Sequence, residues 1–259
     1  MSLGGHLREL RNRITISALA IFVAGSLGWI YYDQLLHRLE APVLKVAAER
    51  GHTGLTGLNF SGSGVTGPFA VKLKVAIFVG LLLASPVWIY QIWAFIVPGL
   101  TRREKRWSLI FVAASVPLFF AGGYLAWLSF PKAITTLLDL TPKGGINVIS
   151  AEDYLTFLTR FILAFGLAFL LPVLMVGLNL AHVLPGRLLL KSWRISIFLI
   201  ALFAAVMTPS PDPWSMIFMA IPMVALFFIA VGIALLVDRS RARRAPEFGD
   251  LSDDEASPL

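Results

Sequence analysis

Residues 154–181 read YLTFLTRFILAFGLAFLLPVLMVGLNLA, a stretch in which Arg160 is the only charged side chain. A helix needs about 20 predominantly apolar residues to cross the roughly 30 Å hydrocarbon core of a bilayer. Inside that core every backbone N–H and C=O group must be paired within the segment, which a helix achieves. The stretch therefore predicts a membrane-spanning helix that is long enough to tilt.

Five further apolar runs accompany this stretch, and together they predict an all-α membrane protein with six transmembrane helices. The fifth run has only about 13 apolar residues, or about 20 Å of helix at 1.5 Å per residue, which is too short to span comfortably. A proline-rich turn, PSPDP at 209–213, joins it to the sixth run, so we expect the two to form a short final hairpin. The six predicted spans are 14–32, 71–97, 108–130, 154–181, 194–208 and 214–237.

The composition supports lipid as the solvent. Of 259 residues, 57% are hydrophobic and 14% are charged, and the mean hydropathy is +0.78, a balance that one soluble core could not hide from water. The net charge of +7 suggests nucleic acid at first sight, but the basic residues lie in short clusters between apolar runs, so no nucleic-acid partner is expected. The chain has no cysteine, which excludes disulfides and thiolate metal sites.

The basic clusters predict the orientation, because loops rich in lysine and arginine are retained in the cytoplasm. The clusters occupy the N-terminus, the second and fourth connections and the C-terminal tail, so both ends are expected inside. The same alternation places the first, third and fifth connections outside. The clustered residues are Arg8, Arg11, Arg13, Arg102, Arg103, Lys105, Arg106, Arg187, Lys191, Arg194, Arg239, Arg241, Arg243 and Arg244.

Two segments outside the predicted spans differ in character. The first outer loop, 33–70, opens with a plausible amphipathic helix over 34–48 and then becomes rich in Gly, Ser and Thr. The tail, 238–259, turns from basic to acidic, a composition that cannot bury enough surface to fold. We therefore expect one membrane domain over 1–237, followed by a disordered cytoplasmic tail.

Prolines lie inside four of the predicted helices, at positions 86, 117, 172 and 222. Each removes a backbone hydrogen bond and favours a kink. Proline is common in membrane helices, so two interpretations stay open. The prolines either make ordinary kinks or together shape one concave surface.

Two carboxylates stand in the most basic surroundings of the chain, Glu9 within HLRELRNR at 6–13 and Glu104 within TRREKR at 101–106. Both are expected at the cytoplasmic headgroup level. One interpretation is an interfacial ion pair with a neighbouring arginine, worth about 0 to 1 kcal/mol when exposed. The other is that the two carboxylates accept guanidinium groups of a ligand, a planar bidentate match that lysine cannot reproduce.

The remaining polar residues indicate no catalysis. Arg160 is most simply a snorkelling side chain satisfied by Glu152 or Asp153. No nucleophile–base pair, carboxylate dyad, phosphate loop or metal cluster is evident, so neither an enzyme nor a cofactor is expected. Three neutral polar residues in or beside the spans fit hydrogen bonds between helices better than transport sites: Gln91, Asn179 and Thr208.

The stretch YQIWAFIVPGL at 90–100, followed by the basic loop that holds Glu104, resembles the signature of the TatC family. The start of the chain, 6–13, is similar to that family's amino-terminal motif. The resemblance runs in order over nearly all of residues 6–237. Its other elements are Ala41-Pro42, Phe165-Gly166 with Pro172, Thr208-Pro209 with Asp212, and 220–223.

TatC is the receptor of the twin-arginine translocase, which exports folded proteins across the bacterial cytoplasmic membrane. The resemblance implies a cupped six-helix fold that binds signal peptides with two adjacent arginines at Glu9 and Glu104, with Phe95 beside the site. It also implies single-helix partners, TatA and TatB, on the fifth and sixth helices, an oligomeric receptor complex, and transport driven by the proton gradient. The residues that the resemblance places in the groove or its frame are Pro42, Gln91, Pro98 and Pro172, and those near the partners are Thr208, Asp212 and Met216.

The chain departs from the family at one important position. Family members often carry a glutamate inside the fourth helix, where this chain has Leu170. Gln91 is a possible substitute for that polar group, and Met216 stands near a position that is often glutamine. A small-solute permease of the same topology is the alternative function, and binding of a twin-arginine peptide distinguishes the two.

Overall fold

A computed structural model describes residues 3–49, 58–59, 64, 66–96, 104–139, 149–180, 183–207 and 213–242. These residues form helices and one isolated bridge between Asn59 and Ser150. The chain is therefore all-α within the part described. The helices are α1 (Leu3–Ile30), α2 (Tyr32–Glu49), α3 (Gly67–Leu83), α4 (Ser85–Ile96), α5 (Glu104–Asp139), α6 (Ala151–Leu180), α7 (Gly186–Lys191), α8 (Trp193–Met207) and α9 (Pro213–Ala242).

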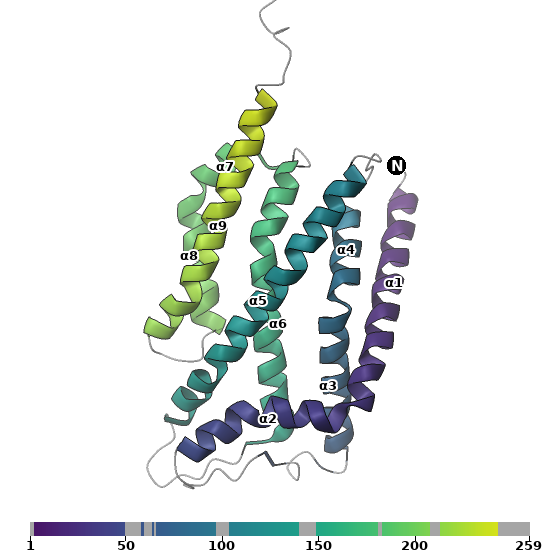
Figure 1. The fold of residues 1–259 in the computed structure, drawn as a ribbon, viewed down its shortest axis with the longest axis vertical. Helices are drawn as coiled ribbons and strands as arrows, with labels where there is room; N and C mark the ends of the chain where they lie inside the picture. The colour runs from purple at the N-terminus through teal and green to yellow at the C-terminus, as the bar shows by residue number, and fades with distance from the viewer. Residues whose placement is uncertain are drawn as a thin grey trace, which may run out of the picture.

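The long helices run up and down between two ends of the molecule (Figure 1). Helices α1, α5 and α8 run away from the end at which α1 begins, and α3–α4, α6 and α9 return to it. Helix α9 finishes at this same end, which we call the terminal end. Helix α2 lies across the opposite end, the α2 end, beneath α5 and α6. Both ends of the described chain thus lie on one side of the bundle.

Four helices, α1, α5, α6 and α9, are long and apolar enough to cross a membrane. The pair α3 and α4 adds a fifth span if the two count as one. Helix α8 is apolar but has only 15 residues, about 22 Å at 1.5 Å per residue. The α8–α9 hairpin accordingly stops short of the α2 end (Figure 1). This agrees with the short final hairpin expected from sequence.

The helices differ in extent from several of the predicted spans. The second span is interrupted at Ala84, where its halves α3 and α4 differ in direction by 61°. Helix α5 extends beyond the predicted 108–130 at both ends. Helix α9 continues past 237 to Ala242, so the first residues assigned to the tail are helical.

The break between α3 and α4 follows from Pro86, which cannot donate a backbone hydrogen bond and whose ring excludes the carbonyl four residues earlier. The indole Nε1–H of Trp88 donates to the Leu81 carbonyl at 2.9 Å. This carbonyl lies in the last turn of α3, where helical partners run out. Trp88 is 9% exposed and packs edge-on against Phe119, with ring centroids 5.4 Å apart. The Trp88 side chain therefore supplies a hydrogen bond across the break between α3 and α4.

Replacing Trp88 with phenylalanine keeps a ring in this cluster but leaves the Leu81 carbonyl without the indole donor. We expect the variant to lose about 1–3 kcal/mol, the cost of an unsatisfied buried acceptor. Thermal unfolding in detergent measures the loss. Trp193→Phe is the control, because Trp193 is 41% exposed and its replacement should change stability by about 0.5 kcal/mol at most. Equal unfolding temperatures for both variants contradict this account of the break.

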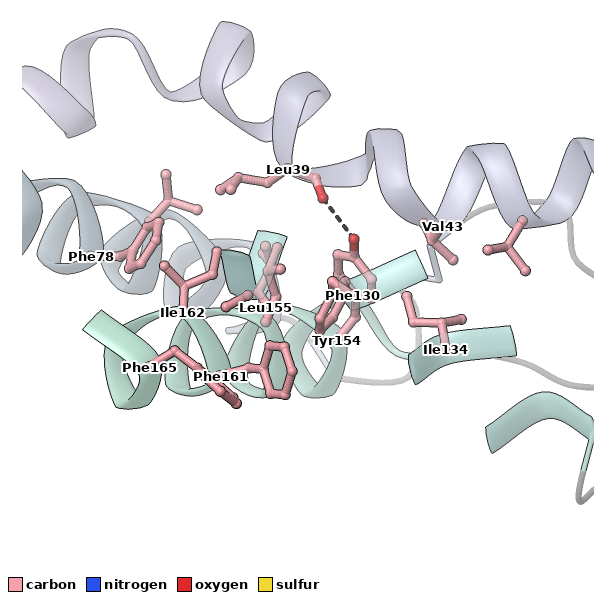
Figure 2. Close-up of a cluster of buried hydrophobic side chains, with 14 of the residues drawn as sticks. Leu39, Val43, Phe78, Phe130, Ile134, Tyr154, Leu155, Phe161, Ile162 and Phe165 are labelled. Atoms are coloured by element: carbon pink, nitrogen blue, oxygen red, sulfur yellow. Dashed lines mark hydrogen bonds between the residues drawn. The ribbon is translucent and has the colours of Figure 1, made fainter. Parts of the chain in front are cut away.

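The main core includes residues of α2, α3, α5, α6 and α9, and aromatic side chains pack between α5 and α6 within it (Figure 2). Phe130 of α5 is fully buried and contacts the rings of Tyr154 and Phe161 of α6. The Tyr154 hydroxyl donates to the Leu39 carbonyl of α2 at 2.7 Å. Helix α2 also buries Val43 in the same cluster. The amphipathic helix predicted in the first outer loop is confirmed, and its apolar face seals the α2 end of the core.

A polar cluster ties the C-terminal part of α9 to the end of α6. The Asp238 carboxylate accepts hydrogen bonds from the Asn179 amide at 2.9 Å and from the Gly186 backbone N–H at 2.6 Å. The Arg241 guanidinium donates to the carbonyls of Asn179 and Leu180 at 2.9 and 2.8 Å. These are among the last carbonyls of α6, which have no partner within their own helix. Arg241, which lies beyond the predicted span, therefore caps a neighbouring helix.

Candidate functional site

Glu9 lies near the start of α1, at the terminal end, and is held by a neighbouring arginine. The Arg13 side chain donates from Nε to Glu9 Oε1 at 3.0 Å and also from Nη2 to the same oxygen. Arg13 stands one helical turn later, the spacing at which side chains share a face. The side chains of Glu9 and Arg13 are 28% and 22% exposed. Glu9 therefore forms the ion pair with a neighbouring arginine that the first interpretation predicts.

A second helix completes this cluster. The Nη1 group of Arg13 donates to Gln91 Oε1 of α4 at 3.2 Å. Among the described residues, the contacts of Glu9 all use Oε1. Its other oxygen, Oε2, can therefore accept further hydrogen bonds without disturbing Arg13. The result is a half-buried carboxylate whose position is set by α1 and α4 together.

An aromatic pair extends the site toward the start of α1. The His6 ring stacks on the Phe95 ring of α4, with centroids 4.6 Å apart and an interplanar angle of 23°. His6 precedes Glu9 by three residues, so both side chains lie on the face that meets α4. Phe95, which was expected beside the Glu9–Glu104 site, contacts His6, the residue three positions before Glu9. Sequence reasoning missed His6 and Arg13 as members of the site, although their spacing from Glu9 was visible.

Glu104 is the first residue of α5, and its side chain lies outside what the structure describes. The start of α5 is at the terminal end of the bundle, as is the start of α1 (Figure 1). The two helix starts that carry Glu9 and Glu104 thus share one side of the molecule. This arrangement is compatible with a joint role for the two carboxylates.

The other sequence-predicted residues are spread over the molecule. Pro42 is buried within α2, at the α2 end, and Pro172 is buried within α6, where it lines an apolar cavity of about 160 Å³ that also involves α8 and α9. Met216 is half-buried near the start of α9. Three more lie outside the described residues: Pro98, Thr208 and Asp212.

Gln91, suggested as a possible substitute for the missing glutamate of the fourth helix, makes its side-chain contact in the Glu9 cluster. Gln91 bonds Arg13 of α1, whereas Leu170 lies on α6 and is 7% exposed. Leu170 packs in an apolar cluster with Trp88 and Phe119. The position is therefore filled by packing, and the Gln91 amide belongs to the Glu9 cluster.

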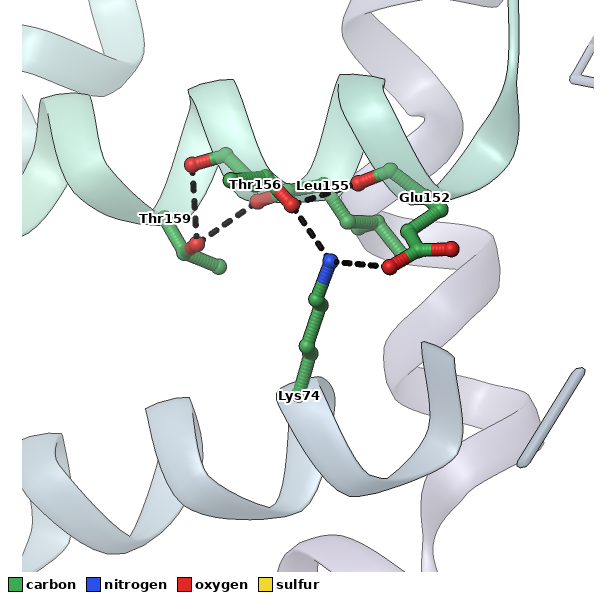
Figure 3. A network of polar contacts seen from close by, with 5 residues as sticks. All are labelled: Lys74, Glu152, Leu155, Thr156 and Thr159. Atoms are coloured by element: carbon green, nitrogen blue, oxygen red, sulfur yellow. Dashed lines mark hydrogen bonds and ion pairs between the residues drawn. The ribbon is translucent and has the colours of Figure 1, made fainter. Parts of the chain in front are cut away.

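A separate polar network lies toward the α2 end (Figure 3). Lys74 of α3 donates from Nζ to Glu152 Oε1 at 2.8 Å and to the Thr156 hydroxyl at 2.6 Å, both on α6. Glu152 was expected to satisfy Arg160 but pairs with Lys74, and Arg160 is exposed. Glu152 is also in the first turn of α6, where the helix dipole favours negative charge. The network joins two helices and serves as a structural contact.

A double-mutant cycle of Lys74→Met and Glu152→Gln measures this contact. We expect a coupling free energy of about 0.6 kcal/mol and at most about 1.7 kcal/mol, as for polar contacts between other membrane helices. Both side chains are about one-third exposed, which keeps the value small. Unfolding of each variant in mixed detergent gives the four free energies. A coupling above about 3 kcal/mol contradicts the assignment, because that magnitude belongs to a fully buried pair.

The helices and the Glu9 cluster together define the class of protein. It is a multi-pass α-helical membrane protein with a charged, half-buried pairing site at the terminal end. Within the described residues, no group of three or more His, Cys, Asp and Glu side chains could hold a metal ion. The Glu9 carboxylate in this cluster bonds a guanidinium group of the chain itself, that of Arg13.

Comparison with known proteins gives the family. A model described as Sec-independent protein translocase protein (TatC) matches residues 5–222. The chain is 43% identical over 244 residues to the TatC protein of Xylanimonas cellulosilytica, covering 94% of this chain and 87% of the relative. It is 40% identical to that of Frankia casuarinae over 268 residues, covering 100% of this chain and 73% of the relative.

A solved structure described as Twin Arginine Translocase Receptor TatC superposes with a TM-score of 0.69 at 30% identity, covering 90% of this chain and all of that one. The chain therefore belongs to the TatC family. It is a component of the Tat protein translocase, a membrane transport system, and works with the other Tat components.

Proposed function

We propose that this chain is the signal-peptide receptor of a twin-arginine translocase, and that Glu9 and Glu104 bind the two arginines of the signal. The observation that carries the proposal is the half-buried Glu9 carboxylate at the terminal end, held at one oxygen by Arg13 of its own helix. A similar solved protein is described as a twin-arginine translocase receptor, which supports the assignment. The cargo is a folded protein, and the proton gradient drives its export.

In the free receptor, the guanidinium group of Arg13 takes the place of a guanidinium group of the ligand. It holds the carboxylate in an orientation suited to a guanidinium group, so little ordering remains to be done when the signal peptide arrives. An arriving arginine uses the free Oε2 or displaces Arg13, which stays bonded to Gln91. Lysine offers a single ammonium and cannot form the parallel pair of hydrogen bonds. The site should therefore discriminate arginine from lysine.

The apolar part of the signal peptide follows the stacked His6 and Phe95 rings into the bundle. Phe95 is half-buried and so presents part of its ring. We place TatA and TatB on the α8–α9 hairpin, near Thr208, Asp212 and Met216. An apolar cavity lies between α6, α8 and α9. It supports this position because apolar surface on a short hairpin suits the packing of partner helices.

The proposed topology has six spans with both ends in the cytoplasm of a bacterium. Helices α3 and α4 form one bent span in it, the second, and α8 forms the fifth, shorter one. The shared terminal end of α1 and α9 supports placing both ends on the same side (Figure 1). The excess of basic residues at that end supports the cytoplasmic side. The residues after 242 form the cytoplasmic tail, and the active receptor is an oligomer.

Photocrosslinking tests the proposal. A labelled twin-arginine peptide is mixed with the purified full chain, and a lysine–lysine peptide serves as the control ligand. We expect strong labelling by the first peptide, weak labelling by the second, and loss of labelling in a Glu9→Ala/Glu104→Ala double variant. Equal labelling in all three mixtures rejects the receptor function and leaves a small-solute permease as the alternative.

A further inference from the structure

An apolar groove of about 340 Å³ lies between α2, α3 and α5, with one residue of α6 at its base. Its walls include Phe78 and Leu82 of α3 together with Phe120, Tyr124 and Trp127 of α5. Phe120 and Tyr124 are 43% and 64% exposed, so the groove is open to the surroundings of the bundle. The groove is distinct from the Glu9 cluster, which lies at the terminal end.

One charged side chain lines this groove. Arg38 reaches it from α2, the helix that lies across the α2 end of the bundle (Figure 1). No carboxylate among the described residues forms an ion pair with Arg38. Arg38 is exposed, and a guanidinium group at the mouth of an apolar groove is suited to pair with an anion that has an apolar body. The groove and the cation together therefore indicate the chemistry of a ligand.

The described walls of the groove are mostly aromatic and aliphatic, so an extended alkyl chain fits beside these side chains. Arg38 lies on an amphipathic helix at the end of the spans, the level at which lipid phosphates lie. Guanidinium groups bind phosphate through paired hydrogen bonds.

We propose that this groove binds an anionic phospholipid, with its phosphate on Arg38 and one acyl chain along Phe120, Tyr124 and Trp127. The lipid fills the space beneath α2 and joins that helix to α3 and α5. Because the site stands at the opposite end from Glu9, it does not depend on the proposed peptide binding. Its failure in an experiment and the failure of the receptor function are therefore separate results.

The test uses the full chain in nanodiscs with a photoactivatable lipid. Phosphatidylglycerol and phosphatidylcholine carry the same diazirine acyl chain, and mass spectrometry locates the adducts after irradiation. We expect adducts on the α5 segment that contains Phe120, Tyr124 and Trp127. We expect phosphatidylglycerol to label this segment about fivefold more than phosphatidylcholine, the factor that one cation near an anionic headgroup supplies.

Three variants separate the charge of Arg38 from the general charge of α2. Arg38→Gln should reduce labelling by phosphatidylglycerol to the level of phosphatidylcholine, and Arg38→Lys should retain most of the difference. Lys45→Gln removes an exposed cation of the same helix that does not line the groove, and should change nothing. Unchanged elution and unfolding temperature show that each variant is folded.

Four results overturn the proposal. The first is equal labelling by the two lipids in the wild-type chain, and the second is adducts that map outside the groove. The third is a preference for phosphatidylglycerol that survives Arg38→Gln. Displacement of the adducts by an apolar peptide, without any dependence on the lipid headgroup, also rejects the lipid and assigns the groove to a peptide.

Discussion

Replacing Glu9 with glutamine should lower the affinity for a twin-arginine signal peptide by about 10- to 150-fold. The change removes one charge-assisted contact to a guanidinium group, which is worth about 1.5–3 kcal/mol. Glutamine keeps the size of the side chain, and Arg13 keeps its hydrogen bond to Gln91, so the packing of α1 on α4 is preserved. Isothermal titration or fluorescence anisotropy with the purified receptor measures the two dissociation constants.

The matched control removes the same charge elsewhere. Glu152→Gln neutralises a carboxylate that also bonds a basic side chain. Glu152 lies at the start of α6, at the opposite end of the bundle from Glu9. The affinity of the Glu152→Gln variant for the peptide should equal that of the wild-type chain. A lysine–lysine peptide should bind the wild-type chain weakly and lose little on Glu9→Gln. If Glu9→Gln and Glu152→Gln bind the twin-arginine peptide equally well, Glu9 is only a structural ion pair.

Replacing Gly80 with leucine should destabilise the protein by about 3 kcal/mol or more, the upper end of the cost of overpacking. Gly80 is the point at which α3 approaches α1 most closely. A Cβ atom there would stand 2.5 Å from the Ile21 carbonyl oxygen and 3.1 Å from Gly25 Cα. Both are backbone atoms, so no side chain can turn aside and α1 itself must move. Close contact through small residues is a common basis of helix association in membranes.

The same substitution at Gly232 provides the control. Gly232 lies inside α9, and a Cβ atom there meets nothing within 4 Å. Both variants gain about 1 kcal/mol of helix propensity, so the difference between them isolates the clash. Thermal unfolding in detergent should show a large loss for Gly80→Leu and little change or a gain for Gly232→Leu. Similar unfolding temperatures contradict the packing of α1 on α3.

A large part of the fold could be predicted from sequence because lipid leaves few choices for an apolar segment. The run at 154–181 became α6 within three residues at its start and one at its end. The shortness of α8 and the helix of the first outer loop were also predictable, the former from the length of its apolar run and the latter from apolar residues that recur on one face of a helix. The ends of α5 and α9 were missed because polar helical turns continue beyond the apolar run.

Proline positions alone did not identify the broken span. Pro117, Pro172 and Pro222 lie inside continuous helices, and Pro86 stands at the interruption between α3 and α4. The difference lies in what surrounds each proline. At the break, Trp88 supplies a hydrogen bond to the Leu81 carbonyl, and this partnership depends on a fold that places the indole there.

The candidate site was likewise predicted only in part from the sequence. Glu9 was identified because a carboxylate amid arginines at a membrane surface is unusual in this composition, and Phe95 followed from the family resemblance. Contact between α1 and α4 could not be predicted, since residues 13 and 91 are far apart in sequence. The pairing of Lys74 with Glu152 was missed for the same reason, as was the place of Leu170 in an apolar cluster.

The sequence by itself determined the solvent, the helices, the basic ends of the chain and the family, because apolar run length and charge placement are properties of local segments. Only the tertiary structure decided which polar groups meet. Arg13 lies between Glu9 and Gln91, and Arg38 at the mouth of a groove, because helices distant in the chain pack side by side. Such contacts depend on the closeness of packing, which residues like Gly80 permit and which no single segment encodes.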